Sequence, residues 1–107
     1  MGWEVHATRA TDWINSSENP ITTEEWLRVV ADDPELKIDD QNSPYFAVWS
    51  GPCSYPKGSW FDWHDGQIHT KNPDQAILGK LLEIAAKLGA VVQGDDGEIY
   101  RCADDLK

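Results

Sequence analysis

The sequence is poor in basic residues. Nine lysines and arginines stand against 19 aspartates and glutamates, which gives the 107-residue chain a net charge of −10. Binding to nucleic acid phosphates or to an anionic membrane depends on basic groups that displace counterions. We therefore expect no nucleic acid and no membrane among the partners, and we expect a basic partner instead.

Long apolar runs are also absent. The opening residues, MGWEVHATRA, lack the apolar segment of a secretion signal. No other stretch approaches the roughly 20 apolar residues that cross a bilayer. These absences predict a cytoplasmic protein. In that compartment Cys53 and Cys102, which lack Cys-x-x-Cys spacing, are most simply reduced thiols, although the sequence leaves a disulfide between them open.

Motifs for catalysis and cofactor binding are missing too. The chain contains no Gly-x-Ser-x-Gly elbow, no phosphate-binding loop, no His-Glu-x-x-His and no glycine fingerprint for a dinucleotide. We therefore predict a protein that is not an enzyme and that uses neither a cofactor nor a metal ion.

The residues that are present are typical of one folded domain. Hydrophobic residues make up 40% of the chain and aromatic residues 10%. Chains of this composition are ordered, and this length suffices for one hydrophobic core but not for two. We expect a single α+β domain over residues 1–107.

Two helices are predicted from their end signals. In ITTEEWLRVVADDP, Thr22 and Glu25 can form a capping box, and Pro34 ends the helix. In KNPDQAILGKLLEIAAKLGA, we expect Asn72 to be the N-cap and Gly89 to follow the last helical turn. Both segments carry an apolar stripe that must be buried.

Alternating side chains and turn residues indicate six strands. Asp65-Gly66 predicts a tight hairpin, and residues 94–97 predict a second hairpin that pairs Gln93 with Glu98. The predicted order is strand, helix, three strands, helix, two strands. That order fits a two-layer sandwich in which a mostly antiparallel sheet carries both helices on one face. The strands are expected in WEVHATRA, YFAVWS, SWFDWH, QIHTK, AVVQ and EIYRC.

The first hairpin places three cross-strand pairs on its more polar face: Trp60 with Lys71, Asp62 with His69, and His64 with Gln67. One interpretation is a metal or acid/base site formed by Asp62, His64 and His69. The alternative is an ordinary solvated sheet face. An exposed Trp60 would be a typical anchor for a protein partner, but it can also lie under the stem of Lys71.

Acidic residues are concentrated in two segments, which hold ten of the 19. Such runs are either solvated surface that keeps a small protein soluble or a docking surface that attracts a basic partner. A third possibility is a mimic of nucleic acid, in which carboxylates stand in for phosphates. The first segment contains Asp32, Asp33, Glu35, Asp39 and Asp40, and the second contains Asp95, Asp96, Glu98, Asp104 and Asp105.

Three stretches carry a resemblance to a known kind of protein: ITTEEWLRVVADDPEL, WFDWHDGQIHTKNPD and IAAKLGAVVQGDDGEIY. Together they resemble small single-domain bacterial proteins of the kind encoded as immunity proteins beside secreted toxins. The resemblance spans nearly the whole chain and implies a cytoplasmic binder that blocks a toxin domain. It carries over no active-site residues.

Together, these observations predict an acidic protein-binding module, a monomer or weak dimer, that neutralises a basic toxin domain by occluding its active site. The alternative is a small metal-dependent or general acid/base enzyme that uses Asp62, His64 and His69. The residues predicted to bind the partner are Asp32, Asp33, Glu35, Asp39, Asp40, Trp60, His64 and His69.

Overall fold

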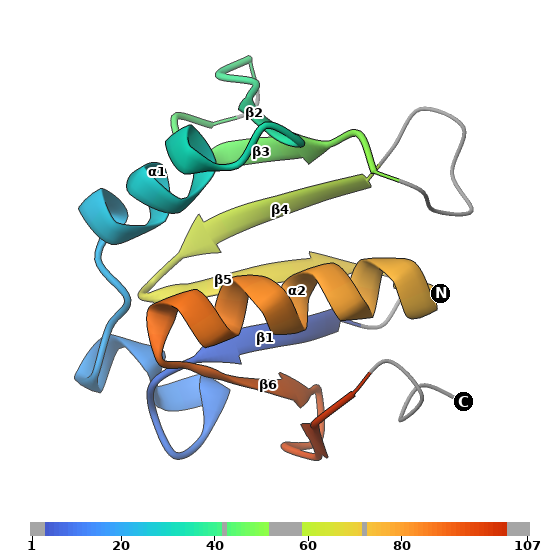
Figure 1. Cartoon of the computed structure of the whole chain (residues 1–107). Coiled ribbons are helices and arrows are strands. Elements are labelled where there is room, and N and C mark those ends of the chain that lie inside the picture. Colours follow the sequence, from blue (N-terminus) through green and yellow to red (C-terminus); the bar gives the residue numbers. More distant parts are fainter. Residues whose placement is uncertain (1–3, 42, 52–58, 72, 103–107) are drawn as a thin grey trace.

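A seven-stranded sheet and two α-helices form the domain in the computed structural model, which is described for residues 4–41, 43–51, 59–71 and 73–102 (Figure 1). The strands are β1 (Glu4–Thr8), β2 (Leu36–Ile38), β3 (Phe46–Trp49), β4 (Ser59–His64), β5 (Gln67–Lys71), β6 (Val91–Gly94) and β7 (Ile99–Tyr100). The helices are the 3₁₀-helix η1 (Trp13–Glu18), α1 (Thr23–Asp32) and α2 (Gln75–Leu88).

The sheet has the order β2-β3-β4-β5-β1-β6-β7, and all its pairs are antiparallel. Figure 1 shows α1 and α2 on the same side of this sheet. The predicted two-layer α+β architecture is therefore confirmed. Among the described residues, no helix has the length and apolar content that a membrane crossing requires.

Helix α1 begins as its sequence predicts. The Thr22 hydroxyl accepts a hydrogen bond from the Glu25 amide (3.1 Å), and the Glu25 carboxylate accepts one from the Thr22 amide (3.2 Å). Arg9 also donates two hydrogen bonds to Glu25, and these lower the pKa of that carboxyl to about 2. The helix ends at Asp32, two residues before Pro34, because a residue that precedes proline avoids the helical region.

Helix α2 begins two residues later than expected. Its N-cap is Asp74, whose carboxylate accepts a hydrogen bond from the Ile77 amide (2.8 Å). The prediction of Asn72 as N-cap is wrong, and Asn72 itself lies outside the described residues. A carboxylate at this position is favoured by the positive end of the helix dipole. At the other end Gly89 has φ 64°, a left-handed conformation that glycine adopts without strain, as predicted.

The two hairpins differ in how well the sequence predicts them. In the β4–β5 hairpin, Asp65 and Gly66 have φ 48° and 88°, and the predicted pairing of Asp62 with His69 is confirmed. In the β6–β7 hairpin, Gln93 pairs with Ile99, so the predicted pairing of Gln93 with Glu98 is wrong. The loop there is one residue longer on the β7 side, because Gly97 takes a left-handed φ of 84°.

Two elements were not predicted. Strand β2 lies within the acidic segment, and η1 lies in a stretch rich in Asn and Ser that reads as a loop. A three-residue strand is too short to show alternation, and β2 exists because β3 supplies its hydrogen-bonding partner. The observed strand count therefore exceeds the predicted six by one.

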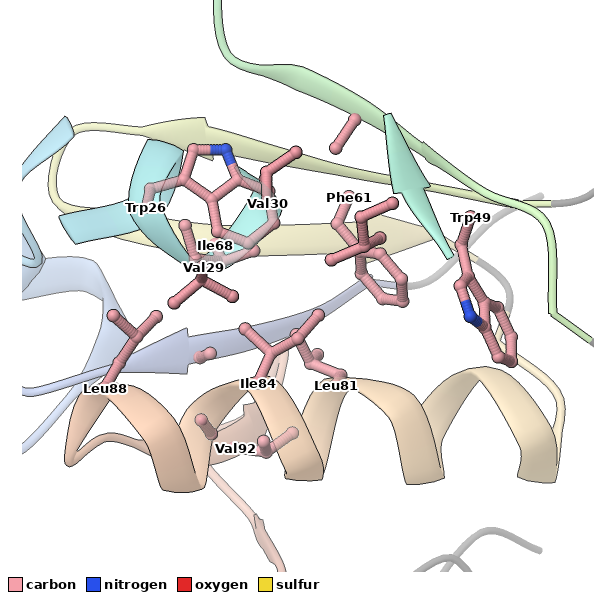
Figure 2. Close-up of a cluster of buried hydrophobic side chains, with 14 of the residues drawn as sticks. Trp26, Val29, Val30, Trp49, Phe61, Ile68, Leu81, Ile84, Leu88 and Val92 are labelled. Carbon is pink, nitrogen blue, oxygen red and sulfur yellow. The ribbon is translucent and has the colours of Figure 1, made fainter. Parts of the chain in front are cut away.

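The hydrophobic core lies between the sheet and the two helices (Figure 2). Trp26 of α1, Phe61 of β4 and Ile68 of β5 are completely buried there. Leu81 and Ile84 supply the stripe of α2, as its spacing predicts. The side chains on the helix-facing side of the sheet thus pack into the hydrophobic core.

Candidate functional site on the outer face of the sheet

The side of the sheet that faces away from α1 and α2, here called the outer face, carries the residues of interest. Strand alternation directs Phe61 and Trp63 toward the helices and Trp60 and Asp62 to the outer face. Cross-strand pairing then places Val48 beside Trp60. This face therefore collects side chains from several strands.

Four rings form a row across β3, β4 and β5, here called the aromatic row. Phe46 stacks beside Trp60 with ring centroids 5.4 Å apart, and Trp60 meets the edge of His69 at 5.5 Å. His64 lies 6.4 Å from His69. Phe46, Trp60 and His69 are half-buried, while His64 is exposed. Half-buried aromatic rings on a sheet face are typical contact groups for a partner.

A hollow of about 500 Å³ lies at the β2 end of the sheet. Three carboxylates line it, from Glu35, Asp39 and Asp40, and Lys37 is the one basic residue among its lining groups. Val48 also lines this hollow and is the cross-strand partner of Trp60. The acidic hollow and the aromatic row are therefore continuous, although the sequence suggested them as two separate features.

The polar groups of the aromatic row are held in place by neighbours. The Asp62 carboxylate accepts a hydrogen bond from the Ser43 hydroxyl (3.0 Å). Burial lowers the pKa of His69, an effect that the nearby carboxylates of Glu4 and Asp62 oppose and the nearby imidazoles of His6 and His64 reinforce. His69 is therefore mainly neutral at pH 7, so it presents a hydrogen-bonding ring without a full charge.

The metal interpretation of Asp62, His64 and His69 gains no geometric support. Asp62 is engaged by Ser43, and the two imidazole rings are separated by 6.4 Å between centroids. Within the described part of the chain, no group of three or more His, Cys, Asp or Glu residues could hold a metal ion. Cys53 lies outside the described residues.

Asp33 does not lie on the outer face. It is 7% exposed, and its carboxylate accepts a hydrogen bond from Lys80 of α2 at 2.5 Å. Burial raises the pKa of Asp33, but the hydrogen bonds from Lys80 and from the Glu35 amide outweigh it and leave the pKa below its ordinary value. Asp33 therefore forms a buried ion pair that connects the end of α1 to α2. We exclude it from the contact surface.

The other predicted acids divide between two places. Asp32 lines a groove between α1 and α2, on the opposite side of the sheet from the aromatic row. Glu35 is 48% exposed, but its carboxylate also accepts a hydrogen bond from the Trp49 indole (3.1 Å). Asp39 and Asp40 are the carboxylates best placed for a partner. In the second acidic segment, Asp104 and Asp105 lie outside the described residues.

A third histidine, His6, was missed as a member of this face. It is 2% exposed, and its ring nitrogens face Gln67 and Asp95 oxygens, the latter at 3.1 Å. The Trp13 ring of η1 stacks on it at 3.8 Å. This part of the outer face is thus closed by η1. Alternation in β1 places His6 beside His69, but the contact with Trp13 has no local sequence signal.

The fold and this site define a small α+β protein with a half-exposed aromatic row next to an acidic hollow. We compared the chain with family models, with curated proteins and with solved structures, and none of the three comparisons gives a match. The geometry of the site is therefore the basis on which a function can be assigned.

Proposed function

We propose that this chain is a protein-binding module that recognises a basic protein through the outer face. The observation that carries the proposal is the continuity of the aromatic row with the acidic hollow, which meet at Val48. A protein contact surface is typically built this way, with aromatic anchors at its centre and charges at its rim.

The two parts have different physical roles. The carboxylates of Asp39 and Asp40, within a chain of charge −10, attract a basic partner over a distance and speed association. The Trp60 indole then provides apolar area that loses its remaining contact with water on binding. Steering affects the association rate, and the buried ring mainly affects dissociation.

We further propose that the partner is a toxin domain and that the chain is its immunity protein. The resemblance of three stretches to such proteins and the acidic charge support this assignment. A small cytoplasmic binder, monomeric or weakly dimeric, would neutralise the toxin by covering its active site. This mechanism requires a binding face and no catalytic group.

Co-expression tests this function. The products of the genes adjacent to this one are expressed in a bacterial host with and without the chain, and growth is measured. We expect a basic product to arrest growth and the chain to restore it. Trp60→Ala and Asp40→Lys should weaken this protection.

Two matched variants control for the effect of changing any exposed acidic residue or any exposed apolar residue. Asp96→Lys makes the same charge change in the β6–β7 loop, and Ile99→Ala removes an apolar side chain that is 50% exposed on β7. Both lie at the opposite end of the sheet from the acidic hollow and should protect fully. Equal protection by all four variants, or no protected product, would reject the proposal.

A further inference from the structure

Strand β2 forms one edge of the sheet, and some of its backbone groups have no backbone hydrogen-bonding partner among the described residues. The Ser50 amide donates to the Glu35 carbonyl (3.0 Å), and the Asp39 amide donates to the Phe46 carbonyl (2.8 Å). In an antiparallel pair every second residue is bonded to the neighbouring strand, so Leu36 and Ile38 direct their backbone groups away from β3.

One of the backbone groups that point away from β3 already has a hydrogen-bonding partner nearby. The Leu36 amide donates to the Asp33 carbonyl at 3.1 Å. The Leu36 carbonyl and both backbone groups of Ile38 remain, and the structure gives them no backbone partner within the described residues. An edge with free donors and acceptors of this kind can accept one further strand.

The acidic hollow lies along this same edge. Lys37 and Asp39 alternate with the edge residues, so their side chains share the outer face, and both line the hollow, as does Ile38. Glu35 precedes β2 and also lines the hollow, but its half-exposed carboxylate is bonded to the Trp49 indole and lies 3.4 Å from the Lys80 ammonium of α2. A strand added at the edge would place its own outer-face residues beside Lys37 and Asp39, and its end beside the exposed part of Glu35. The charge order acid, base, acid thereby selects a strand with the complementary order.

The opposite edge of the sheet is formed by a shorter strand. Strand β7 has two residues, of which Ile99 is 50% exposed, and Arg101 follows it directly. The acidic hollow lies at the β2 edge. Figure 1 shows β2 and the β6–β7 hairpin at opposite ends of the molecule.

We propose that the partner contributes an extended basic segment that pairs with β2 as an eighth strand, with a cation opposite Asp39, no cation opposite Lys37, and a second cation at the end of the strand near the half-exposed Glu35 carboxylate. This inference rests on the proposed function, since it specifies how the basic partner is held. The backbone bonds supply affinity, and the alternating side chains supply selectivity.

Two synthetic heptapeptides test the charge order. The first is acetyl-Val-Lys-Val-Glu-Val-Lys-Val-amide, and the second, acetyl-Val-Lys-Val-Lys-Val-Glu-Val-amide, has the same composition. In either strand direction the second peptide places lysine opposite Lys37 and glutamate opposite one acid. Each is titrated into the ¹⁵N-labelled protein at low salt, and amide shifts and hydrogen exchange are followed by NMR.

The first peptide should shift the Ile38 amide and slow its exchange, while the amides of β7 stay unchanged. The second should bind about tenfold more weakly, because two cross-strand charge pairs become repulsive. A further variant, Ile38→Pro, removes the edge donor without touching the bonds to β3 and should abolish binding of the first peptide. If that variant does not fold, the comparison of the two peptides on the unaltered protein tests strand addition by itself.

Other results would overturn strand addition. If the peptides bind equally, or shift β7 amides as strongly as Ile38, the attraction is diffuse and no strand is added. If the Trp60 indole shifts while the Ile38 amide keeps its exchange rate, the outer face binds the peptide but the edge does not. In that case the strand proposal fails, whereas the proposed function is still judged by growth protection.

Discussion

Strand β4 allows the two faces of the sheet to be compared within one short segment. Phe61 points toward the helices and is completely buried, whereas Trp60, one residue earlier, is half-buried on the outer face. Phe61 packs with residues from α1 and α2, and Trp60 packs with Phe46 and His69 of neighbouring strands. A large aromatic side chain therefore stabilises the fold on one face and remains accessible for recognition on the other.

The largest effect on stability should come from a substitution on the face of the sheet that the helices cover. Phe61→Ala should lower the free energy of unfolding by about 3–5 kcal/mol, because a fully buried ring leaves a cavity. Phe46→Ala removes the same ring on the outer face and should cost about 1 kcal/mol. Urea unfolding followed by circular dichroism measures both. Similar losses in the two variants would show that the outer face is also part of the core.

Breaking the buried ion pair on the helix side of the sheet should have the next largest effect on stability. Lys80→Met leaves the buried carboxylate of Asp33 without its hydrogen-bonded cation, with only the Lys87 ammonium 4.0 Å away, and should cost about 3 kcal/mol. The double variant Lys80→Met/Asp33→Leu removes both charges and should recover most of that loss. Thermal unfolding of the two proteins provides the comparison. A double variant as unstable as the single one would assign the loss to packing instead of charge.

The sequence predicts local features of the two faces and misses what pairing over long distances creates. The β4–β5 hairpin follows from Asp65-Gly66 and alternation, both of which are local. The acidic hollow depends on the pairing of β2 with β3, and β2 is too short to be seen in the sequence. The Lys80–Asp33 pair joins residues 47 positions apart, so the sequence alone read Asp33 as a surface charge.

A smaller effect concerns the outer face and pH. Burial lowers the pKa of folded His69, so below the unfolded value of about 6.5 the unfolded chain binds a proton that the folded chain does not. Folding stability should therefore fall as pH drops from about 6.5 toward the folded pKa. His69→Gln should remove that part of the decline when urea midpoints at pH 7.5 and 5.5 are compared. An unchanged decline would show that His69 is not the titrating group.

The division of roles between the faces is tested most directly on Trp60. Once a protected toxin is identified, Trp60→Ala is measured by calorimetric titration against that toxin and by urea unfolding. Affinity should fall about 30-fold, or about 2 kcal/mol, while the free energy of unfolding changes by less than about 1 kcal/mol. An unchanged affinity together with a large loss of stability would contradict the account, because Trp60 would then belong to the fold and not to recognition.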